Sequence, residues 1–356
     1  MNGGRVRAAL AGAGFWGSRA HLPALLAQPE VDVVGVIDPD LARARDLAAS
    51  GSIPHAYATL GEMIDLQPLD LVVIAAPTEE HAPLATAALQ SGIAVLCEKP
   101  LANTIDVAVR LAELSARTEV PSTVGYSFRY SPPLQALKRD IVSGSLGTPW
   151  LLEMFEYNAQ FHPSRGKPTG WKGDPAQARA GALLEYGSHL IDMAEWLAGP
   201  IEGVHGSFAR VLPDARLDDI ATLQIAFHAP AIGILVSGWV LSGSIPGIKI
   251  RFHGSEGLAE VELNQTLPGG QAYRRSNLDG EMREMSLEPV GDAVSNNATR
   301  HVADIIVRLR GGESPYPGTM PTFGDGVRVQ RVIEAALTAN GDTGSSLSRG
   351  GQSDLQ

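Results

Sequence analysis

Cysteine is nearly absent from this sequence of 356 residues, and acidic residues outnumber basic ones. The single cysteine, Cys97, excludes an internal disulfide and a cysteine-based zinc site, and its place in an apolar run predicts a buried thiol. Lysine and arginine total 28 against 39 aspartate and glutamate, a net charge of −11. Because nucleic acids and anionic membranes attract basic surfaces, we expect neither as a partner.

Long hydrophobic runs are also missing. The longest apolar stretch, PAIGILVSGWVL at 230–241, is too short to span a bilayer and contains glycine and serine. The N-terminal stretch MNGGRVRAALAGAG lacks the apolar core and cleavage site of a signal peptide. We therefore expect a cytoplasmic protein. No metal site is expected either, because five histidines share no metal-ligand spacing: His162, His205, His228, His253 and His301.

The length of the chain suits two domains rather than one core. Apolar runs alternate with helical patterns over the first 125 residues, which predicts a parallel, doubly wound sheet. The expected strands of this part are 6–12, 31–38, 69–77, 93–100 and 120–128.

After about Tyr126 the strands become longer and alternate apolar with polar residues, which predicts a mostly antiparallel sheet. These strands are expected at 150–159, 202–212, 218–228, 232–243, 248–254 and 257–263. Helices are expected at 181–199, about 295–310 and 322–340. We therefore predict domains at 1–125 and 126–340, and a disordered polar tail at 341–356.

The sequence GAGFWG directly follows the first expected strand and directly precedes a helix. In this GxGxxG pattern Gly12 permits a tight turn, Gly14 lets the backbone approach a pyrophosphate, and Gly17 lets the helix pack closely. Phe15 and Trp16 complete the loop, and the helix N-terminus offers N–H groups to phosphates. The pattern predicts a dinucleotide-binding Rossmann domain.

Asp38 ends the second expected strand, about 20 residues after Gly17, as the dinucleotide fingerprint requires. Its carboxylate would accept hydrogen bonds from the ribose hydroxyls of NAD and repel the 2′-phosphate of NADP. Arg43 and Arg45 follow closely and are able to weaken that preference, although a solvated helix face is their simpler role. We predict NAD as the preferred cofactor and NADP as the alternative.

The stretch VLCEKPLAN places Glu98, Lys99 and Pro100 immediately after an apolar strand. Charged residues are usually surface residues, so a strand that simply meets water is one interpretation. The carboxyl ends of strands in open α/β sheets bind ligands, which is the other. Further along the chain, Glu185 and His189 lie four residues apart and share one face of the helix at 181–199.

Several motifs in order resemble the Gfo/Idh/MocA oxidoreductases, over about residues 5 to 340. These motifs are GAGFWG, AAPTEEH (75–81), CEKPLA (97–102), VGYSFRYSPPLQALK (124–138), SGSLGTP (143–149) and GALLEYGSHLIDMAEWL (181–197). The resemblance implies an α/β Rossmann domain followed by an α+β domain with a large, mostly antiparallel, open-faced sheet. It also implies a homodimer or homotetramer formed through that sheet, and reversible NAD(P)-dependent oxidation of a secondary alcohol on a sugar or cyclitol.

The resemblance assigns the chemistry to Lys99 and His189. Lys99 would stabilise the developing alkoxide, and His189 has the intrinsic pKa of a general base near neutral pH. Glu185 occupies the position of the family aspartate and is one methylene longer. Glu185 on one side and Asp192 on the other are each placed to orient the imidazole.

The remaining candidates contact the cofactor or the substrate. Thr78 stands where the family often has asparagine, and Lys172 where arginine is common. Arg129 has a second interpretation, a salt bridge that links the domains. His21 is expected to line the cofactor cleft. The predicted cofactor set adds Ala76, Pro77, Thr78, His81, Glu98 and Lys99 to the glycine loop and Asp38, and the predicted substrate set is Tyr126, Arg129, Trp171, Lys172 and Asp192.

Other functions share this fold. Some relatives recycle bound NAD while they hydrolyse glycosides, and others are NAD-sensing regulators without catalytic residues. A role like that of biliverdin reductase is also compatible with the fold, since fold does not fix function. The presence of both Lys99 and His189 argues against the regulator.

Overall fold

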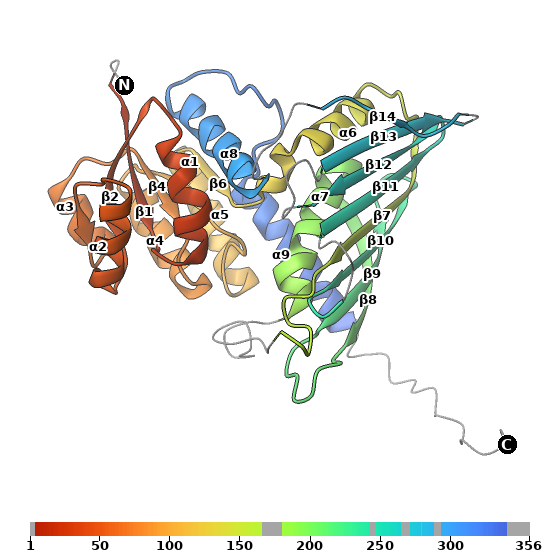
Figure 1. Cartoon of the computed structure of the whole chain (residues 1–356), viewed down its shortest axis with the longest axis horizontal. Helices are drawn as coiled ribbons and strands as arrows, with labels where there is room; N and C mark the ends of the chain where they lie inside the picture. Colours follow the sequence, from red (N-terminus) through yellow and green to blue (C-terminus); the bar gives the residue numbers. More distant parts are fainter. Residues whose placement is uncertain are drawn as a thin grey trace.

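The protein is described here by a computed structural model of residues 4–165, 180–241, 247–264, 271–278, 280–287 and 293–339. A parallel sheet lies at one end of the molecule and a large, mostly antiparallel sheet at the other, with helices between them (Figure 1). The predicted fold class is confirmed. The predicted residues Trp171 and Lys172 and the tail at 341–356 lie outside the described residues.

The first sheet contains six parallel strands in the order β3-β2-β1-β4-β5-β6. The strands are β1 (Val6–Ala11), β2 (Val31–Ile37), β3 (Ala56–Tyr57), β4 (Leu71–Ile74), β5 (Ala94–Cys97) and β6 (Ser122–Val124). The sequence pattern missed β3, which has only two residues. Strands β2 and β3 lie on one side of β1, and β4, β5 and β6 lie on the other. The strand order therefore reverses between β1 and β4, and the carboxyl ends of these two strands form the crevice where such sheets bind ligands.

Helices cover both faces of this sheet. They are η1 (Gly17–His21), a π-helical turn that continues into α1 (Leu22–Leu26), then α2 (Leu41–Ser50), α3 (Leu60–Leu66), α4 (Thr78–Gln90) and α5 (Ile105–Thr118). The side chains of Asp40, Thr59 and Thr104 accept hydrogen bonds from backbone N–H groups in the first turns of α2, α3 and α5. Each of these helices therefore begins at a residue that satisfies a free amide.

The second sheet has the order β14-β13-β12-β11-β7-β10-β9-β8. Its strands are β7 (Pro149–Tyr157), β8 (Ile201–Ala209), β9 (Ile220–Phe227), β10 (Ile232–Gly238), β11 (Gly247–Gly254), β12 (Gly257–Leu263), β13 (Gln271–Asn277) and β14 (Arg283–Glu284). Neighbouring strands are antiparallel except β7 and β10, which pair in parallel. One face of the sheet packs against helices, and the opposite face carries polar and exposed apolar side chains.

The helices that follow the first sheet are η2 (Ser127–Tyr130), α6 (Pro132–Val142), η4 (Leu183–Gly187), α7 (Ser188–Ala198), α8 (Ala293–Leu309) and α9 (Phe323–Ala339). Helix α8 belongs to the second half of the chain, yet it packs on the first sheet beside α1 (Figure 1). Its residues Val302 and Ile305 join the same apolar cluster as Val6 and Leu10. The domain boundaries at 125 and 340 stay predictions.

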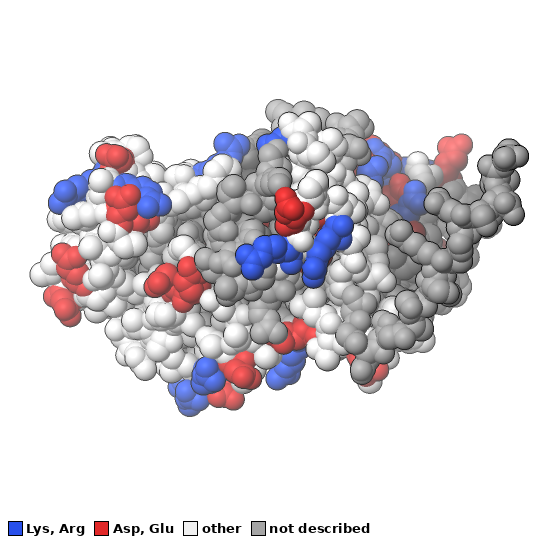
Figure 2. Space-filling view, turned by 90° about the horizontal axis from the view of Figure 1, so that it is seen from below, with Lys and Arg blue, Asp and Glu red and all other residues white. Residues whose placement is uncertain are grey.

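No helix in the described part of the chain combines the length and the apolar character needed to cross a membrane. Charged side chains of both signs lie close to one another on the face shown in Figure 2. On that face, acidic side chains therefore lie among basic ones rather than forming a separate acidic patch.

Candidate active site

The glycine loop has the shape that a pyrophosphate requires. Gly12 has a φ of +107°, and a Cβ on it would lie 2.4 Å from the carbonyl oxygen of Ala75. A Cβ on Gly17 would lie 2.0 Å from the carbonyl oxygen of Gly12. Gly14 instead faces open space, since a Cβ there would meet no atom within 4 Å. The loop thus leaves room for phosphate at the position where the fingerprint needs it.

Asp38 stands beside this loop and holds it. Its Oδ2 accepts a hydrogen bond of 2.9 Å from the backbone N–H of Ala13, and its Oδ1 accepts one of 2.9 Å from Asp40. The guanidinium of Arg43 lies 3.7 Å from the same carboxylate. The predicted ribose-binding carboxylate is therefore buried at the carboxyl end of β2, and Arg43 is directed toward it.

His81 connects α4 to the turn that follows β5. Its two ring nitrogens lie 2.8 Å from the carbonyl oxygen of Pro100 and 2.9 Å from that of Ala76. Burial lowers the pKa of His81, and the two carbonyl contacts oppose that shift. His81 thus connects the backbone after β5 to the backbone after β4. Thr78, another predicted residue after β4, is the first residue of α4 at the same crevice.

Glu98 is fixed between η1 and the turn after β5. Its Oε1 lies 2.7 Å from Nε2 of His21, and its Oε2 accepts a 3.1 Å hydrogen bond from the backbone N–H of Lys99. Burial opposes the charge of this carboxylate, but the hydrogen bond and charge of His21 outweigh it and lower the pKa of Glu98. His21 is thus linked to the turn after β5 through Glu98, and its place at the cofactor cleft stays a prediction.

Lys99 reaches across from the first sheet to the helix of the second. Its Nζ donates a 2.9 Å hydrogen bond to the backbone carbonyl of Glu185 and lies 3.4 Å from Oε2 of the same residue. Both side chains are about nine-tenths buried. The lysine of the EKP motif and the acid of the second-domain helix, 86 residues apart in sequence, therefore meet in space.

His189 lies one turn beyond Glu185. Its ring packs edge-on against Tyr126 at 5.8 Å and against Phe128 at 4.8 Å between ring centroids. Among the described residues, its Nδ1 and the hydroxyl of Tyr126 are buried without a hydrogen-bond partner. Burial and then the charge of Lys99 lower the pKa of His189 to about 3, so the ring is neutral at neutral pH.

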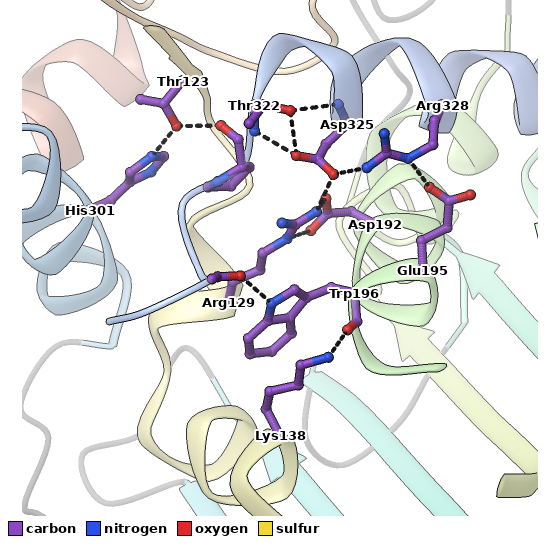
Figure 3. A network of polar contacts seen from close by, with 12 residues as sticks. Thr123, Arg129, Lys138, Asp192, Glu195, Trp196, His301, Thr322, Asp325 and Arg328 are labelled. Atoms are coloured by element: carbon purple, nitrogen blue, oxygen red, sulfur yellow. Dashed lines mark hydrogen bonds and ion pairs between the residues drawn. The ribbon is translucent and has the colours of Figure 1, made fainter. Parts of the chain in front are cut away.

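Arg129 of η2 and Asp192 of α7 form a buried ion pair with each other. Nε of Arg129 donates a 2.9 Å hydrogen bond to Asp192, and the guanidinium lies 3.4 Å from Asp325 (Figure 3). Arg129 is 4% exposed and Asp192 is 1% exposed. Burial opposes the charge of Arg129, but the two carboxylates outweigh it and raise its pKa. These contacts favour the linking salt bridge over substrate contact, which stays a prediction for both residues.

A second arginine, Arg328, extends this network toward the surface, and the network joins η2, α7 and α9 (Figure 3). Arg328 bonds to Asp325 and lies 3.1 Å from Glu195 of α7. Trp196, also on α7, lies with its ring 5.9 Å from the guanidinium of Arg129. The sequence motifs gave no sign of Asp325, because α9 lies far along the chain from the residues it contacts.

Comparison with known proteins places the chain in a family. Residues 6–126 match a profile described as "Oxidoreductase family, NAD-binding Rossmann fold", and residues 134–260 match the "GFO/IDH/MocA C-terminal domain". The chain belongs to the Gfo/Idh/MocA family. It is therefore an oxidoreductase with an NAD-binding Rossmann fold, as the motifs implied.

Two relatives and one solved structure show which proteins this Gfo/Idh/MocA chain resembles. D-apiose dehydrogenase of Paraburkholderia graminis is 26% identical over 74% of this chain and 69% of its own. The rhizopine catabolism protein MocA of Rhizobium meliloti is 32% identical over 55% of this chain and 58% of its own. The structure of levoglucosan dehydrogenase in complex with NADH covers 95% of this chain and 97% of its own, with 21% identity and a TM-score of 0.86, and shows that the fold is shared.

A further acid of this Gfo/Idh/MocA site escaped the sequence motifs. Glu156 lies on β7 with its side chain among the helices, and it is 3% exposed. Burial raises its pKa to about 8, with Lys99 lowering it and Glu185 raising it. The signal in the sequence was the alternation of β7, in which Leu152, Met154 and Glu156 share one face. No cluster of three or more potential metal ligands occurs in the described ranges.

Proposed function

We propose that the protein interconverts a secondary alcohol and a ketone on a sugar or cyclitol by hydride transfer, with NAD as its preferred cofactor. The observation that carries the proposal is the contact between Lys99 and Glu185, with His189 one turn away. This contact joins the EKP turn at the carboxyl edge of the first sheet to the helix over the second. The dehydrogenase names of the relatives support the same reaction class.

In this proposal, each residue has a separate role in charge stabilisation, proton transfer or positioning. Bound nicotinamide would supply the acceptor or donor of the hydride. Lys99 keeps an N–H available beyond those directed at Glu185, and this donor would stabilise negative charge on the substrate oxygen. His189, whose ring packs against Tyr126 and whose Nδ1 has no hydrogen-bond partner among the described residues, would take the hydroxyl proton. Glu185 holds the ammonium of Lys99 in place, which is a role its longer side chain can fill.

A panel assay tests this proposal. Purified protein is incubated with NAD or NADP and a set of inositols, free sugars and nucleotide sugars, and the absorbance of reduced nicotinamide is followed. We expect net reduction with one class of polyol. Silence across the panel with NAD still tightly bound would instead favour the hydrolase that recycles its cofactor or the NAD-sensing regulator.

The preference for NAD rests on Asp38. Its buried carboxylate follows β2 and would repel a ribose 2′-phosphate, although Arg43 is 3.7 Å away and would reduce the repulsion. We expect NAD to bind more tightly than NADP, and Asp38→Ala to narrow the gap about tenfold or more. Asp32→Ala, an exposed position on the same strand, is the matched control. Equal affinities for the two cofactors in the unaltered protein would contradict the preference.

The outer face of the large sheet supports the proposed homodimer or homotetramer. Ile232 and Ile234 of β10 are exposed there, beside the charged pairs Lys249–Glu262 and Arg251–Glu260. An apolar stripe beside complementary charges suits a second copy of the same face. Sedimentation of the protein and of Ile234→Lys tests it, with a monomer expected for the variant only. A location in the cytoplasm also stays a proposal.

A further inference from the structure

The π-helical turn η4, which carries Glu185, begins at a carboxylate from another part of the chain. Ala182 precedes this turn and has no side chain that could bind its free N–H groups. Oδ1 of Asp218 accepts a 2.6 Å hydrogen bond from the N–H of Gly181, and Oδ2 accepts one of 2.8 Å from the N–H of Leu183. The backbone carbonyl of Asp218 accepts a third bond, of 2.9 Å, from Ala182. Asp218 lies just before β9, so these bonds tie η4 to the large sheet.

The backbone approaches Asp218 very closely at this contact. A Cβ on Gly181 would lie 2.1 Å from the carbonyl oxygen of Asp218 and 2.8 Å from the ring of Trp239, so a larger residue does not fit. Asp218 is 7% exposed, and burial raises its pKa, a shift that the N–H groups of Gly181 and Leu183 only partly oppose. A buried carboxylate is costly, and hydrogen bonds from backbone N–H groups offset that cost. The carboxylate is therefore kept in one place by the turn that it binds.

The hydrogen bonds continue from Gly181 to Lys99. The carbonyl oxygen of Gly181 accepts a 3.0 Å bond from the N–H of Glu185. The carbonyl oxygen of Glu185 in turn accepts the 2.9 Å bond from Nζ of Lys99. The path from Asp218 to Lys99 thus runs through two residues, and a shift of the backbone at Gly181 would move the acceptor that holds the ammonium group.

We infer that Asp218 is a positioning residue, which fixes the carbonyl group of Glu185 and thereby the place of the Lys99 ammonium beside the substrate oxygen. Asp218 itself takes no part in proton or hydride transfer. This inference deepens the proposed function and rests on it. Because a displacement of about 1 Å at a reacting group can cost about a hundredfold in rate, a residue at this distance from the chemistry can have a large effect on kcat.

The next residue, Asp219, provides a matched control. It is 1% exposed, so it is at least as deeply buried as Asp218. Its Oδ2 accepts hydrogen bonds from the N–H groups of Val211 and Leu212, and its Oδ1 accepts one from Nε1 of Trp239. Asp219 therefore has the same chemistry and a similar structural load, but it holds the loop after β8 rather than the start of η4.

Steady-state kinetics of Asp218→Asn and Asp219→Asn test the inference, with the polyol found in the panel. The amide oxygen of Asp218→Asn can accept only one of the two N–H groups, and we expect kcat to fall by about tenfold or more. The Kd for NADH should stay unchanged, because the glycine loop lies on the first sheet. Both variants should have a lower Tm, but Asp219→Asn should keep its kcat. Equal losses of kcat in the two variants would show a merely structural role and overturn the inference.

A double-mutant cycle shows whether Asp218 acts through Lys99. Single-turnover rates are compared for Lys99→Ala with and without Asp218→Asn. If the carboxylate serves only to place the ammonium group, the second change should cost nothing further once that group is gone. Losses that multiply in full would overturn the inference.

Chemical labelling separates the inference from the proposed function. Acetylation of Lys99 by acetic anhydride is followed by peptide mass spectrometry with NADH present, and the exposed Lys249 is the internal reference. We expect Lys99 to react faster in Asp218→Asn and at an unchanged rate in Asp219→Asn. Faster labelling in a protein that oxidises no polyol would keep the link from Asp218 to Lys99 and contradict the proposed function alone. Unchanged labelling in Asp218→Asn would overturn the inference even where turnover stands.

Discussion

Two clusters of buried charge lie within three turns of each other on η4 and α7, and they differ in how completely they are paired. At one end Arg129 is held by Asp192 and Asp325, and Arg328 joins Asp325 to Glu195 (Figure 3). At the other end three polar atoms have no partner among the described residues, and they belong to His189, Tyr126 and Glu156. A fully paired cluster holds elements together, whereas unpaired polar atoms in a buried place leave positions for a ligand.

The largest expected effect comes from the incompletely paired cluster. Lys99→Ala removes the cation that we propose stabilises the substrate oxygen, and we expect kcat to fall by about a thousandfold. Thermal stability should fall as well, because the change leaves the buried carboxylate of Glu185 without this lysine, but the folded protein should still bind NAD. Lys249→Ala, an exposed lysine on the outer sheet face, is the control and should keep full activity. Unchanged turnover in both Lys99→Ala and His189→Ala would refute the catalytic assignment.

The paired cluster should respond in stability instead. Arg129→Met leaves Asp192 and Asp325 buried without their shared cation, and we expect a loss of about 3–5 kcal/mol in the free energy of unfolding. Urea denaturation measures it. Arg251→Met, which breaks an exposed pair with Glu260, should cost less than about 1 kcal/mol. A stable Arg129→Met protein with a strongly raised substrate KM would restore substrate contact as the role of this residue.

Glu156→Gln sharpens the comparison further, because a buried acid without a hydrogen-bond partner at Oε2 lowers the stability of the folded state. The folded pKa of this acid, about 8, is raised above its ordinary value near 4.5, so the folded state loses stability as pH rises between these values. Replacement by the neutral amide should therefore raise Tm at pH 8 and change it little at pH 5. We expect a gain of about 1–2 kcal/mol at pH 8, after the cost of burying the amide. A lower Tm at pH 8 would show that Glu156 is stabilising.

Glu185→Asp should have the smallest effect. The hydrogen bond from Lys99 to the backbone carbonyl of this residue survives the change, while the 3.4 Å contact with Oε2 is lost. We expect kcat to fall by no more than about tenfold, with the fold unchanged. Steady-state kinetics with the substrate found in the panel gives the value. A loss as large as that of Lys99→Ala would mean that the carboxylate itself takes part in the reaction.

Much of the site could be predicted because short-range patterns place its parts at known ends of strands and helices. The glycine loop, Asp38 and Lys99 all follow buried strands directly, and a parallel sheet brings such ends to one edge. Glu156 could not be assigned in the same way. The strand WLLEMFEY has apolar and acidic residues on both faces, so the side on which Glu156 is buried depends on which face the helices cover.

The contacts of Arg129 could not be chosen from the sequence either, because they depend on residues far away in the chain. The sequence allowed both a substrate contact and a linking salt bridge, and the choice depends on whether carboxylates from other helices reach it. Asp325 does, from a helix almost 200 residues away, and no local pattern encodes that distance. The parallel pairing of β7 with β10 also lay beyond the pattern, because the turns indicated antiparallel neighbours, whereas β8 and β9 intervene before the chain returns to β7.

The packing of α8 on the first sheet has a consequence for how the protein is made. Ala298, Val302 and Ile305 are at most 4% exposed and lie in the apolar cluster built on Val6 and Leu10. A ribosome releases the first sheet long before it releases this helix, so the nascent nucleotide-binding half carries an uncovered apolar surface for most of translation. A fragment that ends at residue 125 would keep that surface permanently, so we expect it to aggregate where the full chain does not.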